Sequence, residues 1–268
     1  MKTYKQVFAE LKQAGRPALI PFFVIGDPDF DTSLEIVKTA IDAGADVLEL
    51  GIAFSDPIAD GPTIQKADIR AMRSGMTVAK ACRFIRQVKD YRDIPIGLLM
   101  YYNLVYQYGT EKFFADFHIA GVNSVLVADL SIDDAGEITG PAASAGLDTV
   151  FMVTPVTAPE RMKRIASKTT GFIYTVSVLG VTGSRDQLSD TVEGLVARLK
   201  KLTDVPVCVG FGISSPEHAA AIAAAGADGV IIGSKVVSLI EANLDDKQKM
   251  LAEIATFLTE VKSAISPA

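Results

Sequence analysis

The segment AGADVLELG, residues 43–51, shows the unit from which the chain is built. Its Ala-Gly pair is typical of a helix end, because glycine tolerates the left-handed backbone that closes a helix. One residue later comes an aspartate, and then an apolar run that predicts a buried strand. The same order, with Asp or Asn, recurs in AGVNSVLVAD (120–129), AGLDTVFMV (145–153) and AGADGVIIGS (225–234). The chain therefore repeats a unit in which a helix leads into a buried strand.

Ordering these and related strand starts predicts eight strands. DIPIG (93–97) and DVPVC (204–208) are starts of a second kind, in which proline is tolerated as an early strand residue. The expected strands are 18–25, 47–51, 95–100, 124–128, 149–153, 171–175, 206–210 and 229–232. Amphipathic helical stretches lie between them. Alternating strands and helices predict a parallel sheet, and eight strands predict an α/β fold with a closed (β/α)8 TIM barrel.

Two further helices complete the predicted barrel. MKTYKQVFAELKQAG at the amino terminus has apolar residues at helical spacing, and charges interrupt it throughout, unlike a signal peptide. SKVVSLIEA (234–242) predicts a short helix after the eighth strand. No linker rich in Ser, Pro or Gly divides the sequence, so one domain over residues 1–268 is expected. An open doubly wound sheet is the alternative fold, although no GxGxxG pattern follows the first strand.

Composition and charge exclude several classes of partner. Of 268 residues, 49% are hydrophobic and 22% are charged, and the formal net charge is −6. No basic face is thus available for nucleic acid or for an anionic membrane. No apolar run approaches the ~20 residues of a membrane span. Cys82 and Cys208 lie outside any CxxC pattern, which favours core packing in a reducing, cytoplasmic compartment.

The second predicted strand and the loop after it, VLELGIAFSDPIADG (47–61), carry three acids. Side chains alternate along a strand, so Glu49 points into the barrel near the carboxyl-terminal rim, where such barrels place their active sites. No Lys, Arg or His lies between Lys38 and Lys66 to neutralise these acids. Burial raises the pKa of a carboxyl group toward the range useful for proton transfer. Glu49 and Asp60 are therefore the predicted catalytic pair.

Other interpretations of these acids stay open at this point. Glu49 could be a core glutamate hydrogen-bonded to backbone or to a tyrosine. Asp60 could cap the helix that begins near Pro62, and Asp56 could simply shape the loop before Pro57. A Mg²⁺ ion held by the three carboxylates is a further alternative, because Mg²⁺ prefers oxygen ligands. We expect no metal.

Glycines at the ends of three successive strands predict a phosphate site. They occur in LGVTGSR (179–185), GFGIS (210–214) and GSK (233–235). Barrels commonly bind phosphate with the loops after strands seven and eight and a helix N-terminus. Glycine lets backbone N–H groups approach an anion closely. We therefore expect a phosphorylated substrate, with Lys235 as an open candidate for a further contact.

The sequence lacks the side chains that two common routes of carbon–carbon bond cleavage need. A Schiff-base aldolase needs a lysine at a strand end, and Lys168 falls before the sixth strand, at the wrong end. A zinc aldolase needs histidine ligands, and His118 and His218 fall in helical stretches away from the rim. In a carbon–carbon lyase with this rim, the substrate must itself stabilise the departing carbanion, as an indole ring can.

Seven stretches match motifs of one known family: PFFVIGDP (21–28), LELGIAFSDPIADGPTIQ (48–65), IPIGLLMYYNL (94–104), SVLVADL (124–130), GVTGSR (180–185), GFGIS (210–214) and GVIIGS (229–234). With them the chain resembles the tryptophan synthase α-subunit family over nearly its whole length. The resemblance implies a TIM-barrel lyase of tryptophan biosynthesis, without a cofactor of its own. It would cleave indole-3-glycerol phosphate to indole and glyceraldehyde 3-phosphate. It also implies an α2β2 heterotetramer, in which a pyridoxal-phosphate β subunit receives the indole through a tunnel.

The resemblance also implies a role for individual residues. Glu49 would be the general acid/base at indole C3 and the glycerol hydroxyl, and Asp60 would hold the indole N–H. The loops 53–60 and 177–190 would close over the substrate, with Thr182 touching Asp60. The implied indole pocket consists of Phe22, Leu99, Tyr101, Leu126, Tyr174 and Phe211. The implied phosphate site consists of Gly183, Gly212, Gly233 and Ser234.

Three positions depart from the family pattern. Ala53 stands where GIPFSDP has proline, and Val178 and Leu179 stand where bacterial members often have Arg and Ala. These positions fall on loops near the expected β-subunit interface. A stand-alone indole-glycerol-phosphate lyase of the same family is therefore an alternative. Two others are a phosphate-binding barrel enzyme such as a sugar-phosphate isomerase, and a non-catalytic activating barrel subunit.

Overall fold

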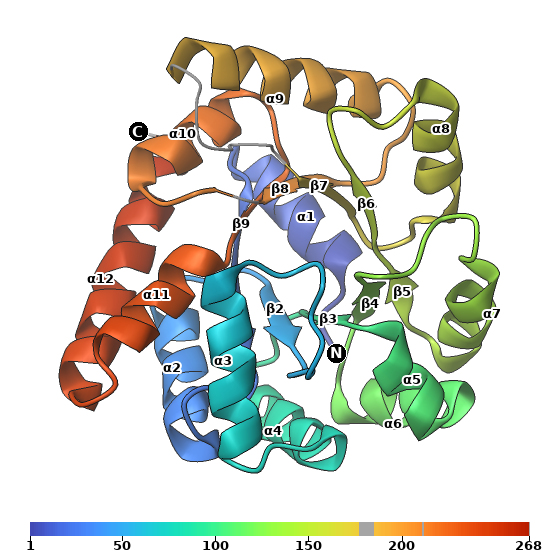
Figure 1. The fold of residues 1–268 in the computed structure, drawn as a ribbon. Helices are drawn as coiled ribbons and strands as arrows, with labels where there is room; N and C mark the ends of the chain where they lie inside the picture. The colour runs from blue at the N-terminus through green and yellow to red at the C-terminus, as the bar shows by residue number, and fades with distance from the viewer. Residues whose placement is uncertain (177–184, 211, 268) are drawn as a thin grey trace.

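The computed structural model describes residues 1–176, 185–210 and 212–267, and its strands form a closed parallel barrel (Figure 1). The strands of these ranges form one sheet in the order β5-β4-β3-β2-β1-β9-β8-β7-β6. They are β1 (Ala18–Val24), β2 (Leu48–Gly51), β3 (Ile96–Met100), β4 (Ser124–Val127), β5 (Asp148–Thr149), β6 (Phe151–Val153), β7 (Ile173–Val176), β8 (Val207–Gly210) and β9 (Gly229–Ile232). The predicted TIM barrel is confirmed.

The fifth predicted strand, 149–153, differs from the expectation because it is divided in two. Its first part, β5, pairs with β4, and its second part, β6, pairs with β7. Val150 lies between them, and its N–H donates to the carbonyl of Val125 at 2.9 Å. The strand therefore changes partners at Val150, and this change joins the two ends of the sheet order into a ring.

Helices surround the ring and connect its strands. They are α1 (Tyr4–Gln13), α2 (Phe30–Asp42), α3 (Pro62–Arg73), α4 (Val78–Tyr91), α5 (Tyr102–Tyr108), α6 (Thr110–Ala120), α7 (Gly136–Ala145), α8 (Pro159–Lys168), α9 (Arg185–Lys200), α10 (Pro216–Ala224), α11 (Ser234–Ala242) and α12 (Lys247–Ala264). The extra amino-terminal helix and the short helix after the last strand are α1 and α11, as predicted. None of the helices in the described ranges is long and apolar enough to cross a membrane.

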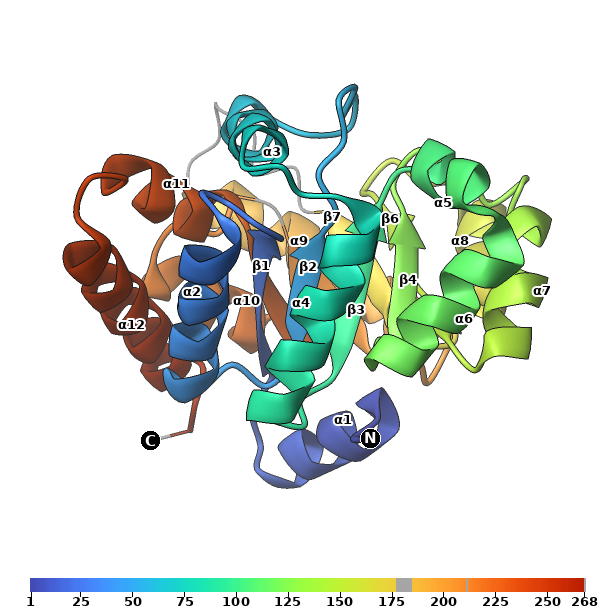
Figure 2. The same cartoon turned by 90° about the horizontal axis from the view of Figure 1, so that it is seen from below.

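Helix α1 lies across the amino-terminal ends of the strands (Figure 2). Its apolar face packs into the barrel interior, beside the inward side chains of the strands; this face consists of Tyr4, Val7, Phe8 and Leu11. Inside the barrel, the hydroxyl groups of Tyr4 and Ser124 are hydrogen-bonded at 2.8 Å. A Cβ atom on Gly97 would lie 2.8 Å from the Tyr4 oxygen, so this contact requires glycine there. The helix thus closes one end of the barrel and leaves the carboxyl-terminal end for a site.

An ion-pair network at the same end ties together segments that are distant in sequence. The Asp46 carboxylate accepts hydrogen bonds from Arg16 at 2.8 and 3.0 Å and from Lys262 at 2.6 Å. It also accepts the N–H of Leu19 at 2.9 Å. Burial alone would raise the pKa of Asp46, but the hydrogen bond from Arg16 and the charge of Lys262 outweigh it and lower that pKa. The folded state therefore holds Asp46 in its charged form.

We expect Asp46→Asn to lower the free energy of unfolding by about 2 to 4 kcal/mol at neutral pH, because two cations lose a partly buried partner. The folded-state pKa lies below the ordinary 3.8. The contribution of Asp46 is therefore complete above that pH and is lost as the pH falls through the folded-state value. Urea denaturation of both proteins over an acid series measures the difference. A difference that does not shrink in acid would contradict the assignment.

Helix α3 lies at the other end of the barrel, beside the carboxyl-terminal ends of the strands (Figure 2). It is fixed there by Arg70, which donates two hydrogen bonds, at 2.6 and 2.8 Å, to Asp27 in the turn after β1. Asp27 is 1% exposed, so this pair is shielded from water. The loop 52–61 from β2 to α3 is therefore anchored at both of its ends.

Candidate active site

Glu49 lies in β2, in register with Phe22 of β1 and Gly97 of β3. Its side chain is 3% exposed, and within the described residues its Oε2 atom has no hydrogen-bond partner. Burial, and next to it the charge of Asp60, raise the pKa of Glu49 to about 8. The alternative hydrogen bond from the backbone or a tyrosine is thus absent at this oxygen among the described residues. At neutral pH Glu49 holds a proton that it can give up and take back.

Asp60 lies in the loop that leads from β2 into α3. Its Oδ2 atom accepts the hydroxyl proton of Tyr101 at 2.7 Å, and the Tyr101 oxygen accepts the N–H of Ala59 at 3.1 Å. Burial raises the pKa of Asp60, and the hydrogen bond from Tyr101 lowers it in part. The helix-cap interpretation of Asp60 is wrong, because Gly61 is the N-cap of α3 and no side chain caps it. The carboxylate faces Tyr101 instead.

Glu49 and Asp60 share one electrostatic environment. The charge of Asp60 raises the pKa of Glu49, and after burial the charges of both acids raise the pKa of Tyr174 further. Within the described ranges, neither acid forms an ion pair with Lys, Arg or His. Two carboxyl groups in one apolar space cannot both ionise easily, so one of them keeps its proton. The site is thus prepared for acid/base chemistry at neutral pH.

Aromatic and aliphatic side chains surround the acids. Of the six residues predicted for the indole pocket, five lie in the described ranges. Four of these are buried, namely Phe22, Tyr101, Leu126 and Tyr174, and Leu99 is half-buried. Phe54, which sequence reasoning did not single out, stacks on Tyr101 with ring centroids 5.1 Å apart. A Cβ on Gly51 would lie 2.8 Å from the Phe22 ring, and one on Gly210 would lie 2.5 Å from the Tyr174 oxygen. Glycines at the strand ends therefore leave room for these rings.

Three of the four predicted phosphate residues, Gly212, Gly233 and Ser234, lie after β8 and β9. Gly212 has a φ of +74°, which favours glycine, and Gly233 is the N-cap of α11, whose first residue is Ser234. A Cβ on Gly233 would lie 3.5 Å from the Phe22 ring, so this helix end adjoins the apolar pocket. The ammonium group of Lys235 lies 5.7 Å from the Phe257 ring centroid, directed toward α12.

Several predicted residues lie outside the described ranges. They are Thr182, Gly183, Phe211, Val178 and Leu179. Of the other singled-out residues, Asp56 is exposed and bonded to the Ser55 hydroxyl, and Ala53 is half-buried against the core. His118 and His218 lie in α6 and α10. Among the described residues, no group of three or more His, Cys, Asp or Glu is arranged to hold a metal ion.

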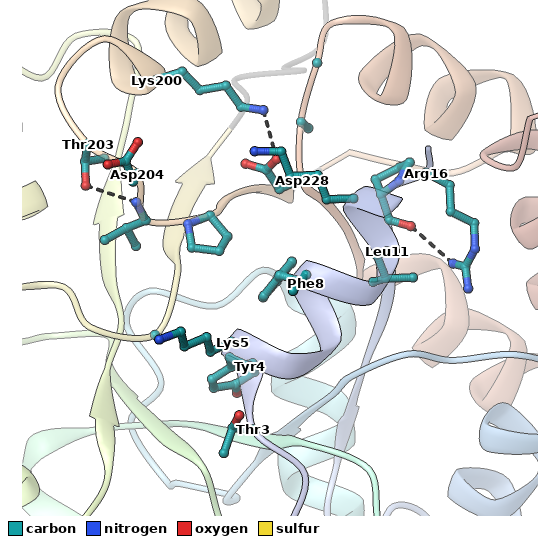
Figure 3. A pocket seen from close by; sticks show the side chains of 18 of the residues that line it. Thr3, Tyr4, Lys5, Phe8, Leu11, Arg16, Lys200, Thr203, Asp204 and Asp228 are labelled. Carbon is teal, nitrogen blue, oxygen red and sulfur yellow. Dashed lines mark hydrogen bonds and ion pairs between the residues drawn. The ribbon is translucent and has the colours of Figure 1, made fainter. Parts of the chain in front are cut away.

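A large hollow lies at the opposite end of the barrel. Its volume is about 920 Å³, and it is lined by α1 and by residues that precede β7, β8 and β9 (Figure 3). There Lys200 donates to Asp228 at 2.8 Å, and Asp228 also accepts the N–H of Val207 at 2.9 Å. Asp228 thus has a cation and an amide as partners, unlike Glu49. The hollow does not overlap the site at the carboxyl-terminal end.

Sequence reasoning also missed Asp68 of α3. Its side chain is 4% exposed, and it shares the buried face of the helix with Ile64, Ala67 and Ala71. Burial and, next to it, the negative charge of Asp60 raise the pKa of Asp68 to about 8. A signal was available, because residues at i, i+3, i+4 and i+7 share one helix face. An acid at the i+4 position of an apolar face is unusual.

Comparisons with known sequences agree with the motifs. The family model described as tryptophan synthase alpha chain matches residues 8–266. A tryptophan synthase alpha chain from Methanothermobacter thermautotrophicus is 46% identical over 262 residues, which cover 98% of this chain and 96% of the relative. One from Methanoregula boonei is 43% identical over 264 residues, 98% of each chain.

Solved structures agree as well. Tryptophan synthase subunit alpha from Legionella pneumophila has a TM-score of 0.91 and 30% identity, with 99% of this chain and 98% of that one covered. Tryptophan synthase from M. tuberculosis, solved in an aminoacrylate-bound form, has a TM-score of 0.87 and 29% identity, with 98% of each covered. With a family model and relatives that match along nearly its whole length, the chain belongs to the tryptophan synthase alpha chain family.

Proposed function

We propose that this chain is a carbon–carbon lyase that cleaves indole-3-glycerol phosphate to indole and glyceraldehyde 3-phosphate. The observation that carries the proposal is the carboxyl pair in the apolar end of the barrel. Glu49 is 3% exposed with an oxygen that has no partner among the described residues, and Asp60 beside it forms no ion pair there. Family membership and the aromatic wall around the pair support the same reaction.

The proposed reaction is a retro-aldol cleavage with two proton movements. A proton is added to indole C3, and the bond from C3 to the glycerol chain breaks. The hydroxyl on the adjacent glycerol carbon loses its proton, and the C–O bond becomes the aldehyde C=O. The carboxyl pair supplies the first proton and accepts the second, so the enzyme ends with the protons it began with. The raised pKa of Glu49, about 8, suits it to both movements.

Asp60 is proposed to bind the indole N–H. Protonation at C3 places positive charge on the ring nitrogen, and a carboxylate within hydrogen-bond distance stabilises that charge as it develops. Tyr101 holds the Asp60 carboxylate at 2.7 Å and thereby fixes its orientation. For the substrate phosphate, we propose the backbone N–H groups of Gly212, after β8, and of Gly233 and Ser234, at the N-terminal end of α11.

Exposed apolar side chains at this end support a protein partner. Ile58, Tyr106 and Val156 are 84%, 65% and 89% exposed, and they follow β2, β3 and β6. The carboxyl-terminal ends of parallel strands share one edge of the barrel, so the segments that carry these residues follow strand ends on the same rim. Exposed apolar side chains on one rim are typical of a protein interface, and this supports a partner there. The partner proposed from the family is a tryptophan synthase β subunit that carries pyridoxal phosphate, in an α2β2 assembly.

The experiment that tests the function follows indole release from indole-3-glycerol phosphate, first with the chain alone and then with an added β subunit. Indole release that rises strongly with the β subunit is the expected result. A fast rate that the β subunit does not change would favour the stand-alone lyase. No indole under either condition would overturn the proposed activity and favour the isomerase or the non-catalytic subunit.

A further inference from the structure

Asp68 is a third carboxyl group next to the pair of Glu49 and Asp60. Its side chain is 4% exposed, and in the part of the chain that the structure describes its Oδ2 atom has no hydrogen-bond partner. An ionised oxygen that is buried without a partner is unfavourable, so the group favours its protonated form. The proposed reaction has not used this residue.

The cations near Asp68 serve other acids. In the same helix, Arg70 binds Asp27 with two hydrogen bonds, and Lys66 donates to Glu241 of α11 at 2.6 Å. Lys235, also of α11, lies over the Phe257 ring. The remaining charges that affect the pKa of Asp68 are that of Asp60, in the loop, and, more weakly, that of Asp27, in the turn after β1.

Burial first, and then these charges, raise the pKa of Asp68 to about 8. The group is therefore neutral below this pH and becomes charged above it. Burial also raises the pKa of Asp60, and the hydrogen bond from Tyr101 lowers it in part. At neutral pH Asp68 therefore stays neutral next to Asp60.

A chain of contacts leads from Asp68 to Asp60. The backbone N–H of Phe54 interacts with the Asp68 carboxyl group. The Phe54 ring stacks on Tyr101 with an interplanar angle of 24°, and the Tyr101 hydroxyl donates to Asp60 at 2.7 Å. Through this contact, Asp68 of α3 holds the middle of the loop that carries Phe54 and Asp60.

We infer that Asp68, in its neutral form, is a positioning residue that acts through Phe54 and Tyr101 to hold Asp60 in place for the substrate. This inference rests on the proposed function of Asp60. When Asp68 loses its proton it accepts more strongly from Phe54, but it also puts a second negative charge beside Asp60. The repulsion between these charges then displaces the Asp60 carboxylate, so alkaline pH weakens the arrangement.

The first test does not depend on catalysis. In the isotope-labelled full chain, the backbone amide resonance of Phe54 is expected to titrate with a midpoint near pH 8, the value for Asp68. Asp68→Asn is expected to abolish this titration, and Asp60→Asn is expected to lower its midpoint by roughly one pH unit because a like charge is lost. Glu49→Gln is the matched control and keeps the titration. A Phe54 amide that does not titrate, or that titrates unchanged in Asp68→Asn, would overturn the inference.

The second test measures the effect on the reaction. Asp68→Ala removes the acceptor for Phe54, and we expect it to raise KM for indole-3-glycerol phosphate about tenfold. Asp68→Asn is expected to recover most of that loss at pH 7, since the amide imitates a neutral acid, and to exceed the wild type above pH 8. Equal losses in both variants would overturn the positioning role. Wild-type protein with the Phe54 titration but without indole release would overturn the proposed function alone.

Discussion

Glu49→Gln is expected to lower kcat for indole release by about 10²- to 10⁴-fold, because the amide cannot move a proton. Glutamine has nearly the same shape, so the pocket around Phe22 and Tyr174 stays filled and KM changes little. Steady-state kinetics with indole-3-glycerol phosphate measure both parameters. Asp56→Asn is the matched control, because Asp56 lies exposed on the loop after β2 and is bonded to Ser55. It is expected to keep the wild-type rate in the chain alone.

The same substitution is expected to make the protein more stable at neutral and alkaline pH. In the folded state the pKa of Glu49 is about 8, against 4.5 in its ordinary environment. Between these values the folded protein binds a proton that the unfolded chain has released, so stability falls as the pH rises. The shift corresponds to roughly 5 kcal/mol at most. Glutamine has no such penalty, so Glu49→Gln and the wild type should differ more at pH 8 than at pH 4.

Opposite changes in activity and stability distinguish a catalytic acid from a structural one. A structural glutamate, once replaced, would lower stability and activity together. A group that is buried at a cost to the fold and used in the reaction lowers activity and raises stability when it is replaced. Unchanged indole release by Glu49→Gln, or a less stable variant at pH 8, would contradict the role proposed for Glu49.

The barrel was predictable from the sequence because its signals are local and repeated. Each helix end with glycine and each apolar strand start indicates one unit, and eight units favour closure. The division of the fifth strand at Val150 was not predictable. Its first part pairs with β4 and its second part with β7, and this depends on how distant strands meet. Periodicity within one segment does not contain that information.

The acids of the site were partly predictable. The alternation of β2 predicts that Glu49 points inward, and the lack of nearby bases marks both Glu49 and Asp60. Whether Asp60 caps α3 or faces Tyr101 depends on where Tyr101, which follows β3 and is 41 residues distant in sequence, is placed. Asp68 was missed for a similar reason. Its position on the helix face is visible in the sequence, but its place beside the Asp60 loop follows from the packing of α3 over the barrel.

Asp60→Asn is expected to lower kcat/KM for indole release by about 10²- to 10³-fold, because the neutral amide cannot stabilise charge on the indole nitrogen. The amide oxygen still accepts the Tyr101 hydroxyl, so the loop keeps its anchor. The charge of Asp60 contributes to the raised pKa of Glu49, after burial. Its removal is therefore expected to lower the pKa of Glu49 and to move the corresponding limb of the pH–rate profile to lower pH.

A matched variant separates the charge of Asp60 from its orientation. Tyr101→Phe keeps the carboxylate but removes the hydrogen bond at 2.7 Å that lowers its pKa. The pKa of Asp60 then rises, and activity is expected to be lost mainly at acid pH, where the carboxylate becomes protonated. Asp60→Asn, in contrast, loses activity at every pH. If Asp60→Asn leaves the pH–rate profile in place, the charge of Asp60 does not tune Glu49. If it keeps wild-type kcat/KM, that charge does not assist the departure of indole.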